Sequence, residues 1–131
     1  MSQTFGPDNT PYDAIGGDGE VRALVDTFYD HMDQESQFKV IRELHPEDLG
    51  ESREKLYEFL CGWLGGPQLY IRKRGHPRLR MRHAPFSIGE RERDQWLECM
   101  GRAMDDREIE GELRRFLNQR FTQVAEFMRN E

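Results

Sequence analysis

The residues best suited to chemistry lie in one stretch of the chain, from Gly75 to Ile88. Residues 72–83 contain no acidic side chain, two histidines (His76 and His83) and six cations: Arg72, Lys73, Arg74, Arg78, Arg80 and Arg82. The chain as a whole is acidic, so this basic stretch predicts a local anionic partner.

Two prolines limit the helix that carries these residues. Pro77 suits the first turn of a helix, and Pro85 ends the helix by the residue before it, which leaves room for about two turns. Leu79 and His83 are four residues apart and therefore share one face of that helix. The stretch thus presents an imidazole beside an apolar side chain, with guanidinium groups at the margin.

This layout suits a flat, mostly apolar cofactor with a metal at its centre and carboxylates at its edge. Haem is the leading candidate, because a neutral imidazole is the usual proximal ligand in oxygen-binding haem proteins. A packed histidine, a solvated basic surface or a patch that contacts phosphates are the alternatives. None of these alternatives explains why so short a helix ends in His-Ala-Pro-Phe.

Length and charge narrow the class of protein. The 131 residues suit one domain, with 11–131 as the folded part and 1–10, poor in apolar residues, as a flexible N-terminal extension. The net charge of −6 argues against general binding of nucleic acid or anionic membranes. No apolar run reaches the roughly 20 residues of a membrane span, and the N-terminus lacks the pattern of a signal peptide, so we expect a cytoplasmic protein.

The two cysteines, Cys61 and Cys99, lack the spacing of a metal site and are expected to be buried, reduced thiols. The chain has no Cys-x-x-Cys-His sequence, so any haem is expected to bind without covalent attachment.

The rest of the chain predicts an all-α fold. Apolar residues recur at helical spacing and no segment alternates with period two. Asp18 and Ser36 are expected to cap helices, and Tyr29 projects from an apolar helix face. The helical segments are expected at 11–15, from 18 through 32, 36–44, 51–64, within 77–84, from 87 or 89 through 104, and from about 109 to 128, with 68–74 as a connection.

Several motifs together resemble the group II truncated haemoglobins. They are Gly65-Gly66-Pro67, the run from Arg74 to Phe86, and Glu92-Arg93-Asp94-Gln95-Trp96-Leu97 followed by Cys99-Met100, with Gly16-Gly17 and Phe28-Tyr29 matching the family's first helices. The resemblance covers about residues 11–128. It implies a truncated globin, a two-over-two sandwich of α-helices with a very short helix that bears the proximal ligand.

The resemblance also implies roles for individual residues. His83 matches the iron ligand, whereas His76 lies in the preceding loop and does not. Arg82 matches a residue that pairs with a haem propionate, and Lys55 is expected to do so from the other side. The haem pocket is expected to be lined by Leu56, Phe59, Leu79, Phe86, Ile88, Trp96 and Met100.

On the distal side, where the ligand binds, Tyr29 and Trp96 match polar groups of the family, and Ser52 occupies a variable position facing the ligand. His45 departs from the family's pattern, because members of the family have an aromatic residue, frequently tyrosine, at this corner. It is expected to donate to the ligand, to hold Tyr29 or to bind the iron as a sixth ligand; the first two roles are favoured.

The implied function is a non-covalent haem b (iron protoporphyrin IX) protein with a pentacoordinate iron that binds oxygen, carbon monoxide and nitric oxide reversibly. A hydroxyl and an indole N–H that donate to the ligand would slow its release, which disfavours oxygen transport with fast unloading. The alternatives are nitric oxide dioxygenase or peroxidase-like activity on the same site, served by a reductase, and a haem-free helical module that binds an anionic partner. The sequence leaves the oligomeric state, monomer or homodimer, open.

Overall fold

The computed structural model describes residues 5, 6 and 8–131, apart from the side chain of Arg80. Residues 1–4 and 7 of the predicted N-terminal extension lie outside it. The described part is built from helices and contains no strand, as expected for an all-α fold. The helices are α1 Pro11–Ile15, α2 Asp18–Gln34, the 3-10 turn η1 Ser36–Phe38, α3 Lys39–Arg42, α4 Gly50–Trp63, α5 Leu69–Arg74, α6 Leu79–His83, α7 Glu90–Asp106 and α8 Gly111–Phe127.

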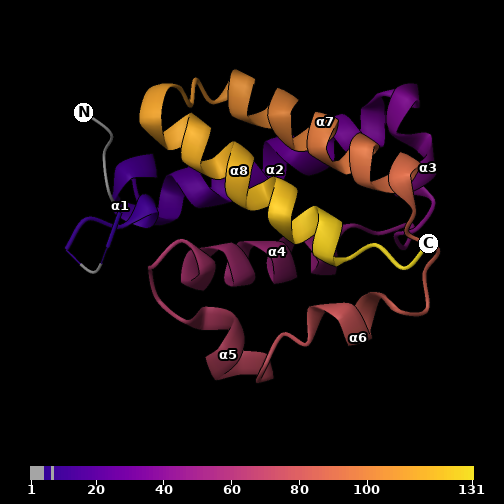
Figure 1. Ribbon diagram of the computed structural model, residues 1–131, viewed down its shortest axis with the longest axis horizontal. Helices are drawn as coiled ribbons and strands as arrows, with labels where there is room; N and C mark the ends of the chain where they lie inside the picture. Colours follow the sequence, from indigo (N-terminus) through magenta and orange to yellow (C-terminus); the bar gives the residue numbers. More distant parts are fainter. Residues whose placement is uncertain (1–4, 7) are drawn as a thin grey trace.

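Four long helices form the body of the molecule (Figure 1). Helix α2 packs on both α4 and α7, and α7 packs on α8, so that α2 with α4 and α7 with α8 make the predicted two-over-two sandwich. Each of these helices buries one apolar face, which is where most of its stability originates. The largest side chains with almost no solvent exposure are Leu24, Phe28, Met32, Phe38, Leu60, Leu64, Met100 and Leu117.

The thiols of Cys61 and Cys99 are free and buried in this core, as predicted. Burial is the main cause that raises their pKa values, to about 11 and about 12, so both stay protonated at neutral pH. In the described residues, no helix is long and apolar enough to span a membrane.

Two helix caps differ from the prediction. Asp18 does not cap α2, because Gly17 is the N-cap and Asp18 is the first helical residue, where it accepts a hydrogen bond from the Tyr57 hydroxyl. Ser36 likewise lies inside η1, with Glu35 as its N-cap. In both cases the residue that was predicted to be the N-cap is instead the first residue of the helical segment. Gly16 ends α1, with its backbone in the left-handed region at φ 117°. Gly17 follows it as the N-cap, so Asp18 is already inside α2.

Helix α5 was not predicted, since Leu69–Arg74 was expected to be a connection. A carboxylate from α4 holds it. Glu58 is only 4% exposed, and its carboxylate accepts from Arg74 Nε at 2.7 Å and from Lys73 Nζ at 3.2 Å. Burial acts to raise the pKa of Glu58, but the hydrogen bonds from Arg74 and Lys73 outweigh it and lower the pKa below its usual value.

The Glu58 contact predicts a stability change that depends on pH. Glu58→Gln should lower the free energy of unfolding by about 1–3 kcal/mol at pH 7, because two cations lose their buried carboxylate partner. Because its pKa is lowered in the folded state, the Glu58 carboxyl stabilises the fold above pH 4.5. This contribution disappears as the pH falls through the folded-state pKa, so the difference in the free energy of unfolding between the two proteins should shrink in acid.

Urea unfolding of both proteins between pH 3 and pH 7 measures this effect. Glu54→Gln is the matched control, since Glu54 lies on the same helix and pairs with Arg22 at 2.8 Å, but its side chain is 39% exposed. The control should cost less than about 1 kcal/mol. Equal losses in the two variants would contradict a special role for Glu58.

The short helix of the basic stretch begins later than predicted. Arg78 adopts the left-handed region at φ 47°, so α6 starts at Leu79, two residues after Pro77, and ends at His83. Pro77 therefore lies outside the first turn, while the limit of about two turns holds. The chain terminus secures the segment after α6, because Asn130 donates to the Phe86 carbonyl at 2.7 Å and accepts from the Ile88 amide at 2.9 Å. Figure 1 shows this end of the chain beside the connection from α6 to α7.

Candidate functional site

His83 is the last residue of α6 and is half-buried. Its Nδ1 lies 2.7 Å from the carbonyl oxygen of Leu79, one turn earlier. A carbonyl can only accept, so Nδ1 carries the hydrogen, and Nε2 of the neutral ring keeps its lone pair. This is the usual arrangement of a metal-binding histidine, in which a second hydrogen bond fixes the ring and its tautomer.

His45 shows the same arrangement in the connection after α3. Its Nδ1 lies 2.8 Å from the carbonyl oxygen of Ile41, so Nε2 is again the nitrogen with a lone pair. Burial is the main cause that lowers the pKa of His45; the hydrogen bond to Ile41 opposes it, and the positive charge of Arg42 lowers the pKa further. The imidazole is therefore neutral at pH 7.

Tyr29 on α2 lies next to His45. Its side chain is 5% exposed, and its ring meets the imidazole of His45 edge to face, at 5.7 Å between centroids. Within the described chain, the hydroxyl has no hydrogen-bond partner. Burial raises the pKa of Tyr29, so the phenol stays protonated and keeps a hydrogen to donate. A hydroxyl without a partner in a mostly buried side chain is available to donate a hydrogen bond to a bound ligand.

Trp96 on α7 joins this group through Phe28. The Phe28 ring lies 5.0 Å from the ring of Tyr29 and 5.4 Å from that of Trp96, so one buried phenylalanine brings the two candidate donors together. The indole N–H of Trp96 has no acceptor among the residues that the structure describes. Phe28 was not singled out as a site residue, although its place directly before Tyr29 was a signal that could have found it.

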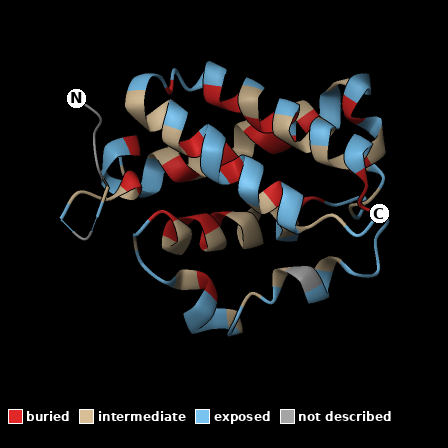
Figure 2. Cartoon of the chain, viewed as in Figure 1, coloured by how far each residue is buried: buried red, intermediate tan, exposed pale blue. Residues whose placement is uncertain are grey.

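The remaining predicted residues differ in how they are placed. Met100 and Ile88 are buried at 1% and 9% exposure, and Phe86 is 40% exposed, so it can only form an edge. Leu56, Phe59, Leu79 and Ser52 are half-buried. Figure 2 shows the contrast between α4, whose inner face is buried, and the largely exposed α5 and α6.

The two cations expected at the rim are engaged with the protein itself. Arg82 donates from Nε to the carbonyl oxygen of Pro77 at 2.8 Å, and Lys55 Nζ lies 3.2 Å from a carboxylate oxygen of Glu51. The bond of Arg82 uses one of its five donors and leaves the guanidinium exposed. Both cations can hold an anionic group at the edge of the site.

Arg53 was also missed by the sequence reasoning. Its guanidinium carbon lies 5.8 Å from the centroid of the Tyr29 ring, and ion pairs with Asp26 and Asp30 of α2 hold it there. Neither contact is visible in the sequence, because the partners come from two helices that pack only in the folded chain.

The donor set fits a haem. His83 offers one imidazole nitrogen that is free to bind iron, and half-buried apolar side chains can contact the porphyrin. The cations Arg82 and Lys55 can pair with the propionates. On other elements, the Tyr29 hydroxyl and the Trp96 indole N–H can donate to a ligand. These are the groups by which a protein controls haem chemistry.

Comparison with known proteins gives the same result. The family model described as bacterial-like globin matches residues 10–130. The chain is 43% identical over 131 residues to the group 2 truncated hemoglobin YjbI of Bacillus subtilis, covering all of this chain and 94% of the relative. The structure of the group II 2-on-2 hemoglobin of Agrobacterium tumefaciens superposes with a TM-score of 0.89 at 44% identity, over 99% of this chain and 98% of that one. The truncated oxygen-avid haemoglobin of B. subtilis gives 0.85 at 45% identity, over 93% and 100%.

The chain therefore belongs to the bacterial-like globins, the class that its helix sandwich and its histidine site define. Within that class it is a group II truncated haemoglobin. Membership of this family implies a haem-based site for oxygen.

Proposed function

We propose that the protein holds one non-covalent haem b through Nε2 of His83 and binds oxygen, carbon monoxide and nitric oxide reversibly, with Tyr29 as the main hydrogen-bond donor to the ligand. The observation that carries this proposal is the bond from His83 Nδ1 to Leu79 O, which leaves Nε2 as the free nitrogen. When bound, haem supplies an iron centre at which a diatomic molecule binds and leaves.

The chain's own residues would set how long the ligand stays. An oxygen molecule held at a ferrous haem would carry extra electron density, so it would accept hydrogen bonds well from residues beside it. On the distal side, the Tyr29 hydroxyl and the Trp96 indole N–H have no partner among the described residues. A hydrogen bond from each to a ligand of this kind is worth about 1.5–3 kcal/mol. Slow oxygen release follows. The description of the B. subtilis relative as oxygen-avid supports this inference.

His45 has a narrower role than the sequence left open. Because its Nδ1–H is used by Ile41 O and its pKa is lowered, the neutral ring offers Nε2 only as an acceptor. His45 would therefore orient Tyr29 through the edge-to-face contact of their rings, at 5.7 Å between centroids, and its Nε2 would be available to accept a hydrogen bond. Donation to the ligand would require a protonated ring, and coordination as a sixth ligand would compete with the contact to Tyr29.

A protein that releases oxygen slowly is better suited to chemistry on oxygen than to transport. Nitric oxide dioxygenation and peroxidase-like turnover are the alternatives on this site. The first would need a reductase to keep a haem iron ferrous, whereas the second would need a reducing co-substrate to balance the two electrons taken by peroxide. Turnover of nitric oxide or peroxide with a supplied reductant separates these activities from simple binding.

Titration of the apoprotein with haemin tests the cofactor assignment. We expect a Soret band that saturates at one haem per chain, with ferrous spectra that change on addition of carbon monoxide. Acid-acetone should remove the haem completely, since no covalent attachment is expected. A titration without saturation, or haem that stays with the protein after extraction, would contradict the assignment.

A further inference from the structure

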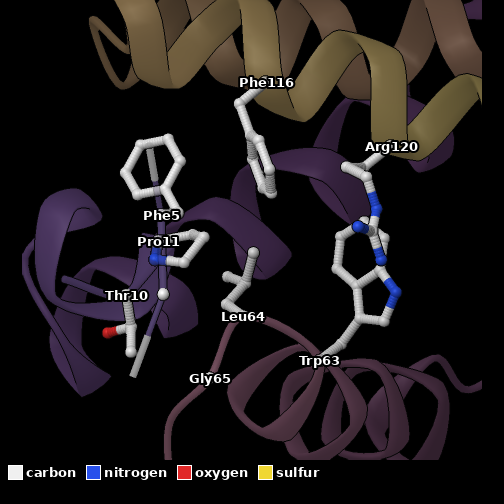
Figure 3. Close-up of a pocket in the computed structure, with 9 residues that line it drawn as sticks. Phe5, Thr10, Pro11, Trp63, Leu64, Gly65, Phe116 and Arg120 are labelled. Atoms are coloured by element: carbon white, nitrogen blue, oxygen red, sulfur yellow. The ribbon is translucent and has the colours of Figure 1, made fainter. Parts of the chain in front are cut away.

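A cavity of about 450 Å³ lies between the segment before α1, the end of α4 and α8 (Figure 3). None of the predicted haem-site residues lines it. Its apolar walls come from Phe5, Pro11, Trp63, Leu64 and Phe116, and Arg120 lies at its side. A volume in this range, with mostly apolar walls and one charged group, is typical of sites for small organic molecules.

The walls hold their positions through aromatic contacts. The rings of Phe5 and Phe116 lie 4.7 Å apart at 58°. Trp63 stacks on Phe121 at 5.0 Å and 28°, and on Phe59 at 6.2 Å and 25°. Because two stacked rings limit the motion of Trp63, this wall of the cavity is ordered before any ligand arrives, which lowers the cost of binding.

Arg120 supplies a charge that no carboxylate of the described residues neutralises. Its guanidinium carbon lies 5.7 Å from the ring centroids of both Trp63 and Phe116, and within the described chain it forms no ion pair or hydrogen bond. Other arginines of α8 do have carboxylate partners: Arg114 bonds Asp105 at 2.7 Å, and Arg115 bonds Glu112. No carboxylate lines the cavity.

We propose that this cavity binds a small aromatic carboxylate, with its rings against Trp63 and Phe116 and its carboxylate on the Arg120 guanidinium. An apolar molecule would leave the cation without an acceptor, and an inorganic anion would leave the aromatic walls exposed to water. A guanidinium accepts a carboxylate through two parallel hydrogen bonds, so one residue can both bind and orient such a ligand. The proposal does not depend on what the haem site does.

Calorimetric titration with 2-naphthoate tests the proposal on the protein as purified. We expect saturable binding of one molecule per chain. Arg120→Gln should weaken it at least about tenfold, since a charge-assisted bidentate contact is lost. The matched control Arg115→Gln, on the same exposed helix, should leave the affinity unchanged. The neutral analogue 2-naphthamide should bind the parent protein at least about tenfold more weakly, and Arg120→Gln should not change its affinity.

The two tryptophans of the chain provide a second readout. With carbon monoxide bound, so that the spectrum stays diamagnetic, 2-naphthoate should shift the indole N–H signal that Trp63→Phe removes and leave that of Trp96 in place. The proposal is overturned if 2-naphthoate does not saturate at millimolar concentration, if Arg120→Gln and Arg115→Gln behave alike, or if the amide binds as tightly as the acid.

Discussion

Replacing His83 by alanine should lower haem affinity at least about a hundredfold, which corresponds to about 3 kcal/mol. The reason is that the His83 imidazole, on the short helix α6, has a free Nε2, and its hydrogen bond to a backbone carbonyl fixes the orientation of its ring. His45 offers a similar nitrogen, but it lies among the distal residues and is in contact with Tyr29. Any haem that remains should therefore lack the spectrum of the parent protein.

Haemin titration followed by the ferrous carbon monoxide spectrum measures this loss, and added imidazole should restore the spectrum by filling the space of the missing ring. His76→Ala is the matched control. His76 is exposed, and its Nδ1 accepts from the Arg78 amide at 3.0 Å, so it is already engaged outside the site. An unchanged titration for His83→Ala, or an equal loss for His76→Ala, would refute the proximal assignment.

The second large effect is expected from the distal donors. Tyr29→Phe should raise the oxygen dissociation rate roughly ten- to a hundredfold, because it removes the buried hydroxyl that has no other partner in the described chain. The double variant Tyr29→Phe with Trp96→Phe should raise the rate further. Both replacements keep an aromatic ring beside Phe28, so the packing of the distal side changes little.

Stopped-flow displacement of oxygen by carbon monoxide gives these rates. Tyr57→Phe and Trp63→Phe are matched controls for the two replacements. Tyr57 bonds Asp18, and Trp63 stacks on Phe121, so neither is a proposed ligand donor. Rates within twofold of the parent in the double variant would show that these groups do not contact the ligand.

The sequence carries more information about the proposed proximal side than about the proposed distal side, for a physical reason. On the proximal side the constraints are local: two prolines limit α6, and the spacing of Leu79 and His83 also gives the hydrogen bond that orients the ring. The distal residues come from α2, α7 and the connection after α3. Their contacts depend on how these elements pack. The free nitrogen of His45 and the contact between Phe28 and Trp96 therefore could not be predicted, although Phe28 stands next to Tyr29 in the sequence.

The errors in local structure arose in the same way. Helix α5 depends on Glu58, a carboxylate about one helical turn before the end of α4, whose contacts with Lys73 and Arg74 exist only after the chain turns back. The predicted caps at Asp18 and Ser36 were wrong because the neighbouring backbone, including Gly16 and Gly17, set the helix starts.

The sequence by itself determined the all-α class, the short helix before Pro85 and the identity of the candidate iron ligand, because helical periodicity and proline geometry act over a few residues. Only the tertiary structure decided which nitrogen of each imidazole is free, which buried donor lacks a partner, and that Trp63 and Arg120 share a cavity. Those properties depend on contacts between residues far apart in the chain, which no local pattern encodes.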